Sequence, residues 1–373
     1  MLNPEPLSEI ETPAMIVDRD RLQQNIAQMQ SLADGRGVRL RPHIKTHKCV
    51  EIAQLQLAQG ALGVTASKVE EALVFIAAGV RSVTVAYPIV DRRKLARLLR
   101  GAQAHGTELR VVVDSAAGFE ALTRGSQDAG TVVGAFVEVD VGLRRCGLTE
   151  HDPQLGPLAR AVHENPTTKF MGLLSHAGHA YAASNREEVA AIAAEECQIL
   201  QRVRQHLEKA GIPVPEVSVG STPTVLASDS YDGITEIRPG NYVFLDRTPV
   251  RLGLATMAQV ALSVVSTVVS RNDDFLIIDA GSKVLSSDLG AHGTAGVDGY
   301  GLAFSESGEQ LQVVRLSEEH GFVARGGADL PIGTRLRIVP NHSCPVVNLA
   351  DELVVVSDGE VVGRWRVAAR GAL

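Results

Sequence analysis

The chain has 373 residues, about two to three times the usual length of a domain, so we expect more than one domain. Lys and Arg total 36 against 43 Asp and Glu, and the resulting net charge of −7 argues against a nucleic-acid-binding protein. Hydrophobic residues make up 45% and charged residues 21%, which excludes wholesale disorder and a coiled coil. No apolar run approaches the roughly 20 residues of a membrane span, so we expect no membrane-spanning segment.

The N-terminus, M-L-N-P-E-P-L-S-E-I-E, lacks the cationic patch and the apolar stretch of a signal peptide. The four cysteines are scattered and form no C-x-x-C pair, which argues against a disulfide scaffold and a zinc ribbon. We therefore expect a cytoplasmic protein.

Strand-like runs of β-branched residues alternate with helix-like stretches rich in Ala, Leu, Glu and Arg. The strand-like runs occupy residues 38–43, 63–67, 82–87, 109–114, 134–140, 170–176, 216–221 and 235–242. The segments between them have the pattern of amphipathic helices, such as residues 69–79, which end in a glycine typical of a helix C-terminus. This alternation predicts parallel strands, and eight repeats predict a closed barrel. An open doubly wound sheet is disfavoured because no G-x-G-x-x-G opens the first helix.

After about residue 255 the pattern changes to strands with few helical intervals. The D-G-E step at residues 358–360 lies between two valine-rich runs and predicts a hairpin turn. We predict an α/β protein with a (β/α)8 TIM-type barrel over residues 14–255, followed by a mostly antiparallel β domain over residues 256–373. Residues 1–13 are expected to join the β domain, and the run A-M-I-V-D at 14–18 precedes the eight barrel strands.

Polar residues follow the predicted barrel strands, at the end where barrel enzymes place their active sites. They are His43, Lys45, Ser67, Tyr87, Asp114, Asp140, His176, Ser221, Thr222, Gly240 and Asn241. A polar residue after one strand is usually a turn or a cap. Because eight strand ends converge on one mouth, we favour a functional pocket.

The sharpest local motif is R-P-H-I-K-T-H-K at residues 41–48, which leaves the first barrel strand. A lysine there can attack an aldehyde when desolvation and neighbouring cations lower its pKa. Arg41, His43, His47 and Lys48 are expected to supply those cations. Taken alone, this basic octamer predicts a solvated turn, but the polar strand ends around it favour a functional lysine.

Two glycine-containing turns, G-S-T-P-T at 220–224 and R-P-G-N-Y at 238–242, follow the last two barrel strands. In barrels this is a frequent phosphate site, because backbone N–H groups and a helix N-terminus point at the anion. Gly220 and Gly240 allow the backbone to approach closely. Each turn alone is unremarkable in composition, but both together, opposite a candidate lysine, indicate a pocket for pyridoxal phosphate (PLP).

With these motifs the chain resembles the alanine-racemase-like (fold type III) PLP enzymes, specifically the D-serine dehydratase and D-threonine aldolase group. The similarity extends from T-P-A-M-I-V-D near residue 12 to V-A-A-R-G at the C-terminus. The resemblance implies a PLP-binding barrel followed by a β domain. It also implies a homodimer with active sites near the subunit interface.

In this family the lysine of P-H-x-K binds the cofactor, which implies Lys45 rather than Lys48. We assign the catalytic roles to Lys45 and His43. The segment G-L-R-R-C-G at residues 142–147 matches a family segment whose arginine contacts a cofactor oxygen, and this implies Arg145.

The motif S-H-A-G-H-A-Y supplies the remaining cofactor contacts that the resemblance implies. His176 takes the position beside the pyridine ring, and Tyr181 closes the same motif. The full expected cofactor-binding set is Lys45, Arg145, His176, Tyr181, Gly220, Ser221, Thr222, Gly240, Asn241 and Tyr242.

The β domain carries a second motif, P-N-H-S-C-P at residues 340–345. His342 and Cys344, one residue apart, can point to the same ion as imidazole and thiolate ligands. Two ligands alone are weak evidence, and a buried cysteine beside a capping histidine is the alternative. The resemblance favours a divalent metal, because this group binds one through His-x-Cys or His-x-Asp here. The ligand types favour zinc, with manganese or cobalt as alternatives.

The resemblance implies a lyase that acts on small β-hydroxy-D-amino acids and binds neither nucleic acid nor membrane. We favour the D-serine dehydratase type, which gives a 2-oxo acid and ammonia, because of the two motif forms around Lys45 and His176 and the cysteine at 344. The alternative is D-threonine aldolase chemistry, which gives glycine and an aldehyde. An amino-acid racemase is disfavoured because it needs no metal. A non-catalytic PLP carrier is disfavoured because such carriers resemble the barrel alone.

Overall fold

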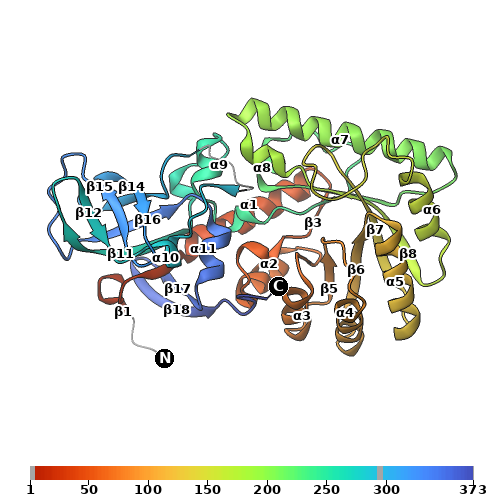
Figure 1. Cartoon of the computed structure of the whole chain (residues 1–373), viewed down its shortest axis with the longest axis horizontal. Helices are drawn as coiled ribbons and strands as arrows, with labels where there is room; N and C mark the ends of the chain where they lie inside the picture. The colour runs from red at the N-terminus through yellow and green to blue at the C-terminus, as the bar shows by residue number, and fades with distance from the viewer. Residues whose placement is uncertain (1–4, 292–296, 373) are drawn as a thin grey trace.

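The computed structural model describes residues 5–291 and 297–372. Figure 1 shows two parts side by side, a barrel of strands wrapped by helices and a separate β domain. The last residues of the chain return to the barrel, where the Ala369 amide donates a 3.0 Å hydrogen bond to the Lys48 carbonyl. Within the described residues, no helix has the length and apolar character to cross a membrane.

The barrel is a parallel sheet of eight strands, counted over the described part of the chain, in the order β3-β10-β9-β8-β7-β6-β5-β4. The strands are β3 (Arg39–Leu40), β4 (Val64–Ala66), β5 (Ser82–Val85), β6 (Glu108–Val113), β7 (Val133–Val139), β8 (Thr168–Ser175), β9 (Glu216–Val219) and β10 (Glu236–Ile237). A bridge between His43 and Thr65 closes the ring from β3 to β4. The barrel predicted from the eight β-branched runs is confirmed.

Helices cover the outside of the barrel strands. They are α1 (Arg19–Gly35), α2 (Val50–Gln59), α3 (Val69–Ala77), α4 (Arg92–Ala104), α5 (Ala116–Ala129), α6 (Leu155–Glu164), α7 (Arg186–Lys209) and α8 (Thr222–Ala227). The short helix α9 (Arg247–Arg251) lies at the junction with the β domain (Figure 1). Side chains with oxygen acceptors begin several of them: Asp91 caps α4, Ser115 caps α5 and Asn185 caps α7. Gly130, in the left-handed conformation, ends α5.

The β domain contains one mostly antiparallel sheet over the described residues, ordered β1-β18-β17-β2-β11-β12-β15-β14-β13-β16, with an added β11–β16 pairing that curls it into a barrel. Its elements are β1 (Glu5–Pro6), β2 (Ala14–Asp18), β11 (Leu262–Arg271), β12 (Phe275–Ile278), α10 (Ser282–Leu285), β13 (Gly301–Ser305), β14 (Gln310–Leu316), β15 (Gly321–Ala324), β16 (Arg335–Pro340), α11 (Ser343–Leu349), β17 (Glu352–Ser357) and β18 (Glu360–Arg366). Asp358 and Gly359, both with positive φ, form the predicted hairpin turn between β17 and β18.

Strand β2 corrects the predicted domain boundary at residue 14. This strand pairs antiparallel with β11 and parallel with β17, so residues 14–18 belong to the β domain and not to the barrel. A five-residue apolar run has the same appearance in both sheets, and its sequence does not identify its partners. From Glu5 on, the described chain therefore starts in the β domain, enters the barrel at α1 and returns to the β domain at β11.

A buried ionic cluster fills the interior of the parallel barrel. Glu236 of β10 accepts hydrogen bonds from Arg41 at 2.8 Å, from Arg110 at 2.7 Å and from the Ser218 hydroxyl at 2.6 Å. Burial would raise the pKa of Glu236, but the two guanidinium groups outweigh it and lower the pKa to about 2. The carboxylate is therefore charged, and it is shared by two buried arginines, of which Arg110 also pairs with Glu216 at 3.0 Å.

Replacing Glu236 by alanine should destabilise the barrel by about 3–5 kcal/mol, because it leaves two buried guanidinium groups without their shared carboxylate. Urea unfolding followed by circular dichroism measures this change. Glu306→Ala, at an exposed loop position, is the control and should change the free energy of unfolding by less than about 0.5 kcal/mol. Equal stability of the two variants would contradict the structural role of the cluster.

Candidate functional site

A cavity of about 290 Å³ lies at the C-terminal ends of the barrel strands. Its lining residues are His43, Lys45, Ser67, Ala86, Tyr87, Pro88, Glu138, Arg145, Cys146, Leu174, His176, Gly220 and Arg238. The residues predicted from the sequence that this set brings together are Lys45, His43, Ser67, Tyr87, Arg145, His176 and Gly220. The polar strand ends therefore do converge on one pocket.

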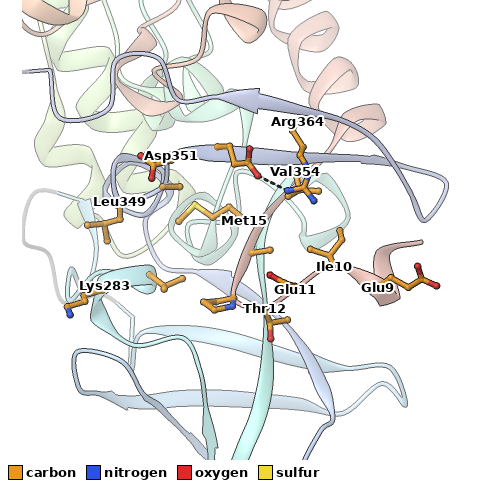
Figure 2. Close-up of a pocket in the computed structure, with 15 residues that line it drawn as sticks. Glu9, Ile10, Glu11, Thr12, Met15, Lys283, Leu349, Asp351, Val354 and Arg364 are labelled. Carbon is orange, nitrogen blue, oxygen red and sulfur yellow. Dashed lines mark hydrogen bonds and ion pairs between the residues drawn. The ribbon is translucent and has the colours of Figure 1, made fainter. Parts of the chain in front are cut away.

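Figure 2 shows a second cavity, of about 640 Å³, where the N-terminal segment crosses the β domain. Its two basic side chains are engaged: Arg364 pairs with Glu352 at 2.6 Å, and Lys283 pairs with Glu319. None of its lining residues is a histidine or a cysteine. Because the groups suited to nucleophilic and metal chemistry line the barrel cavity instead, we place the candidate site there.

Lys45 lies in a short 3-10 turn, η2 (Ile44–Thr46), that leaves β3 and enters the cavity. His43 precedes the turn, and its Nδ1 accepts a 3.4 Å hydrogen bond from the Lys45 amide. Burial lowers the pKa of Lys45, and the guanidinium groups of Arg145 and Arg238 lower it further. A larger share of the amine is therefore neutral, which is the form that attacks carbonyl carbon or accepts a proton.

The prediction that the basic sequence neighbours of Lys45 surround it with positive charge is wrong. Arg41 points into the barrel interior, where it belongs to the buried ionic cluster. Burial lowers the pKa of His43 well below its ordinary value and that of His47 to about 3, so both rings are neutral. Lys48 Nζ lies 3.6 Å from a buried glutamate of α3 and faces the end of the chain. The positions of these basic residues in the sequence did not predict the directions of their side chains.

Arg145 reaches the cavity from the loop that follows β7. The Asp140 carboxylate accepts the amides of Gly142 and Arg144 at 3.0 Å, which folds the start of this loop. The Asp114 carboxylate accepts the Gly147 amide at 3.2 Å and holds its end. Two aspartates that follow neighbouring strands thus fix the loop that presents the arginine.

His176 and Arg238 also line the cavity. Nδ1 of His176 lies 2.9 Å from the Gly220 carbonyl, which makes Nδ1 the protonated nitrogen and fixes the plane of the ring. Arg238 is buried and donates to the Ser218 hydroxyl and to the Ser175 carbonyl. Arg238 belongs to the motif R-P-G-N-Y, but the sequence analysis assigned cofactor binding only to the last three residues of that motif and missed the arginine.

Glu138 is a second cavity residue that the sequence reasoning missed. It is 5% exposed, and burial raises its pKa to about 7, helped by the nearby Asp114 carboxylate. Its position in the run F-V-E-V-D could have indicated it, because a charged residue inside an apolar barrel strand must face a polar interior.

Of the two turns predicted to hold a phosphate, Gly220 lines the cavity, whereas Ser221 and Thr222 are not among its lining residues. Ser221 and Thr224 exchange hydrogen bonds in a capping box that begins α8. Thr222 Oγ1 accepts the Tyr242 amide at 3.1 Å, and Thr222 also hydrogen-bonds with the buried Tyr181 phenol. Burial raises the pKa of that phenol, so it stays protonated. These contacts hold the α8 turn in one conformation beside Gly220.

Gly240, Asn241 and Tyr242 organise the wall and do not line the cavity with side chains. A Cβ at Gly240 would lie 2.9 Å from the His43 carbonyl, so glycine lets this loop pack directly on the lysine turn. The Tyr242 hydroxyl accepts a 3.0 Å hydrogen bond from Gln56 of α2, away from the cavity. The Asn241 amide is directed to the β domain.

His342 and Cys344 lie at the start of α11 and face the barrel. Cys344 Sγ is 3.3 Å from the Thr46 hydroxyl, one residue from Lys45. Burial alone would lower the pKa of His342, but Cys344 and Asp288 outweigh it and raise the pKa to about 10. His342 in turn lowers the pKa of the Cys344 thiol against the effect of burial. Each side chain therefore favours the charged form of the other, and imidazole and thiolate are a donor set that suits zinc.

A buried hydrogen-bond network joins the His342–Cys344 turn to the barrel. The Asp246 carboxylate accepts the Ser343 amide at 2.8 Å and the Asn241 side-chain amide at 2.6 Å. The same Asn241 amide donates to the Ser343 hydroxyl at 2.9 Å. Thr248 Oγ1 donates to the Asn341 carbonyl at 2.9 Å. The network fixes residues 341–344 relative to the barrel loop that follows β10.

Two family models match the chain. The model described as "Alanine racemase, N-terminal domain" matches residues 17–248, and a model of a serine dehydratase domain matches residues 261–356. The chain is 38% identical to D-threo-3-hydroxyaspartate dehydratase of Delftia sp. (strain HT23), over 91% of this chain and 92% of that protein. It is 35% identical to D-threonine aldolase of Arthrobacter sp., over 98% of this chain and 94% of that protein.

Solved structures are also similar to this chain over nearly its whole length. D-threo-3-hydroxyaspartate dehydratase, determined as a cysteine-to-alanine variant in the metal-free form, superimposes with a TM-score of 0.90 at 35% sequence identity. The match covers 97% of this chain and 98% of that one. Barrel and β domain therefore share both their folds and their arrangement with this dehydratase.

Glu138→Gln should stabilise the cofactor-free protein at neutral pH. The folded-state pKa of Glu138, about 7, lies above its ordinary value of 4.5, so its contribution to stability is complete below pH 4.5 and is lost as pH rises through 7. The difference in unfolding free energy between Glu138→Gln and wild type should grow over this window, to on the order of 3 kcal/mol. Thermal unfolding at a series of pH values measures it. The exposed change Glu187→Gln is the control, and a pH-independent difference for Glu138→Gln would contradict the raised pKa.

Proposed function

The chain belongs to the alanine-racemase-like family, with a serine dehydratase domain after the barrel, and on that premise we propose that it dehydrates β-hydroxy-D-amino acids to a 2-oxo acid and ammonia. Membership makes it a PLP-dependent lyase. Beyond family membership, we propose the type of reaction, the bound metal and the roles of individual residues. One observation supports it above the others: the lysine turn of the barrel and the His342–Cys344 turn of the β domain are in direct contact.

The cavity residues fit PLP. Lys45 offers an amine of lowered pKa, Arg145 and Arg238 offer positive charge, and His176 offers a flat ring fixed by the Gly220 carbonyl. When bound, PLP supplies an electron sink for negative charge that develops at the substrate Cα. In this proposal Lys45 Nζ holds the cofactor and later accepts the Cα proton.

His342 and Cys344 fit a divalent metal, since imidazole and thiolate are preferred zinc ligands. Among residues 5–291 and 297–372, no group of three His, Cys, Asp or Glu side chains is placed to hold one ion, so the proposal names these two ligands alone. Such a metal supplies a Lewis acid for the departing β-hydroxyl. The network through Asp246 fixes the main chain between the two ligands, and Cys344 contacts the lysine turn at Thr46.

Dehydration and retro-aldol cleavage start from the same arrangement and differ in which bond breaks. In the first, Lys45 Nζ takes the Cα proton and the β-hydroxyl leaves; in the second, a base takes the hydroxyl proton and the Cα–Cβ bond breaks. Cys344 and the 38% identity to a dehydratase support the first outcome. The 35% identity to a D-threonine aldolase keeps the second as the alternative.

Product analysis separates these two reactions. We expect D-serine, D-threonine and D-threo-3-hydroxyaspartate, incubated singly with the purified protein, to give 2-oxo acid and ammonia from at least one of them. Glycine with an aldehyde as the dominant products would establish the aldolase alternative. The L-isomers are the control, and turnover of L-serine or L-threonine at rates comparable to the D-forms would contradict the proposed stereochemistry.

Lys45→Ala should abolish covalent attachment of PLP, and the absorbance of the protein-linked cofactor should disappear with it. Lys48→Ala is the matched control from the same sequence motif and should retain that absorbance, because Lys48 contacts Glu71 and the Ala372 carbonyl. Borohydride reduction of wild type followed by peptide mapping should label Lys45. A label on Lys48 would show that the wrong lysine had been assigned.

Removing the metal should abolish lyase turnover and leave the PLP absorbance unchanged. His342→Ala and Cys344→Ala should each lower turnover on the order of a hundredfold or more, since departure of hydroxide then lacks its Lewis acid. Cys344→Asp should keep partial activity and shift the preference toward harder ions such as manganese. Full activity after exhaustive chelation, with no metal found by elemental analysis, would refute the metal assignment.

A further inference from the structure

His342 makes a contact that the ligand motif does not include. Its Nδ1 lies 2.9 Å from Oδ2 of Asp288, a residue in the loop after α10. The two side chains are 17% and 32% exposed, so the contact is largely shielded from water. Asp288 is 54 positions away in sequence, and no motif of the chain connects the two residues.

This contact decides which imidazole nitrogen can bind a metal. Neutral imidazole carries one N–H and one lone pair, and a carboxylate at Nδ1 keeps the proton on that nitrogen. Nε2 is then the nitrogen with the free lone pair. The carboxylate also makes the ring more basic and fixes its orientation, as carboxylate partners of metal-binding histidines generally do.

Asp288 lies outside the set of direct ligands. Its Oδ2 is directed at His342 and its Oδ1 lies 3.4 Å from the Gly290 amide. In the described part of the chain, Asp288 does not form a three-residue ion-binding group with His342 and Cys344. The contact at 2.9 Å directs Asp288 Oδ2 at the imidazole ring of His342.

The second carboxylate near His342, that of Asp246, binds the backbone of the turn and not the imidazole ring. Asp246 accepts the backbone amides of Ser343 and Thr248, at 2.8 and 3.0 Å, together with the Asn241 side chain. These bonds fix the main chain of the turn, but they leave rotation of the imidazole ring unrestrained. Asp288 restrains that rotation.

We propose that Asp288 is a positioning residue that holds His342 in the tautomer and orientation required to bind the divalent metal through Nε2. The inference rests on the proposed function, because it requires His342 to be a metal ligand. It adds a third side chain, from a separate loop, to the apparatus of the metal site.

The test measures zinc affinity of the PLP-loaded protein, by competition with a chromophoric chelator. Asp288→Ala should weaken zinc binding about 10–100-fold, the usual cost of removing such a partner. Asp288→Asn keeps an oxygen that accepts the Nδ1–H bond and should lose less affinity than Asp288→Ala. Ser287→Ala, an exposed change next to Asp288, is the matched control and should bind zinc as wild type does. The PLP absorbance of each variant reports that the fold is intact.

Three outcomes would overturn the inference. One is zinc affinity of both Asp288 variants within twofold of the control. Another is an Asp288→Asn variant that binds zinc no better than Asp288→Ala. The third is loss of one oxygen neighbour of zinc in Asp288→Ala, measured by X-ray absorption at saturating metal, which would make Asp288 a direct ligand. Failure of the wild-type protein to bind zinc would refute the proposed metal site itself and is thus a distinguishable result.

Discussion

The contact between two short turns, one from each domain, is the constraint on which the site depends. The lysine turn leaves the first barrel strand, the His342–Cys344 turn begins α11, and Cys344 meets Thr46 where they touch. Neither turn is long enough to fix its own position. Packing at Gly240 and the hydrogen bonds of Asp246 tie both of them to the same barrel loop. The turn that carries Lys45 and the turn that carries His342 and Cys344 are thereby held next to each other.

Buried charged groups occur at two places in the barrel, in its interior and at the C-terminal ends of its strands, and burial has a different effect at each. In the interior, Glu236 lies between two arginines and stays charged, and Glu216 adds a second carboxylate against Arg110. At the strand ends, Lys45, Arg145 and Arg238 share a cavity with one carboxyl, Glu138, whose pKa is raised. Positive charge is in excess there, which suits an anionic cofactor and lowers the pKa of the lysine.

Much of the fold could be predicted from sequence because β-branched runs and amphipathic stretches report burial directly, and all eight barrel strands lie where such runs occur. Residues 14–18 were assigned to the wrong sheet because a short apolar run does not encode its partner. Lys45 was reached through a family motif. Glu138, Arg238 and Asp288 were missed because their roles arise from the direction of a side chain or from a contact distant in sequence.

The central claim is that the barrel and the β domain build one site between them, and anomalous X-ray diffraction from crystals of the PLP- and manganese-loaded protein tests it most directly. A single anomalous peak should lie against His342 and Cys344, on the side that faces Lys45 and the bound cofactor. A peak in the cavity lined by residues 9–15, or elsewhere away from the lysine turn, would contradict the account.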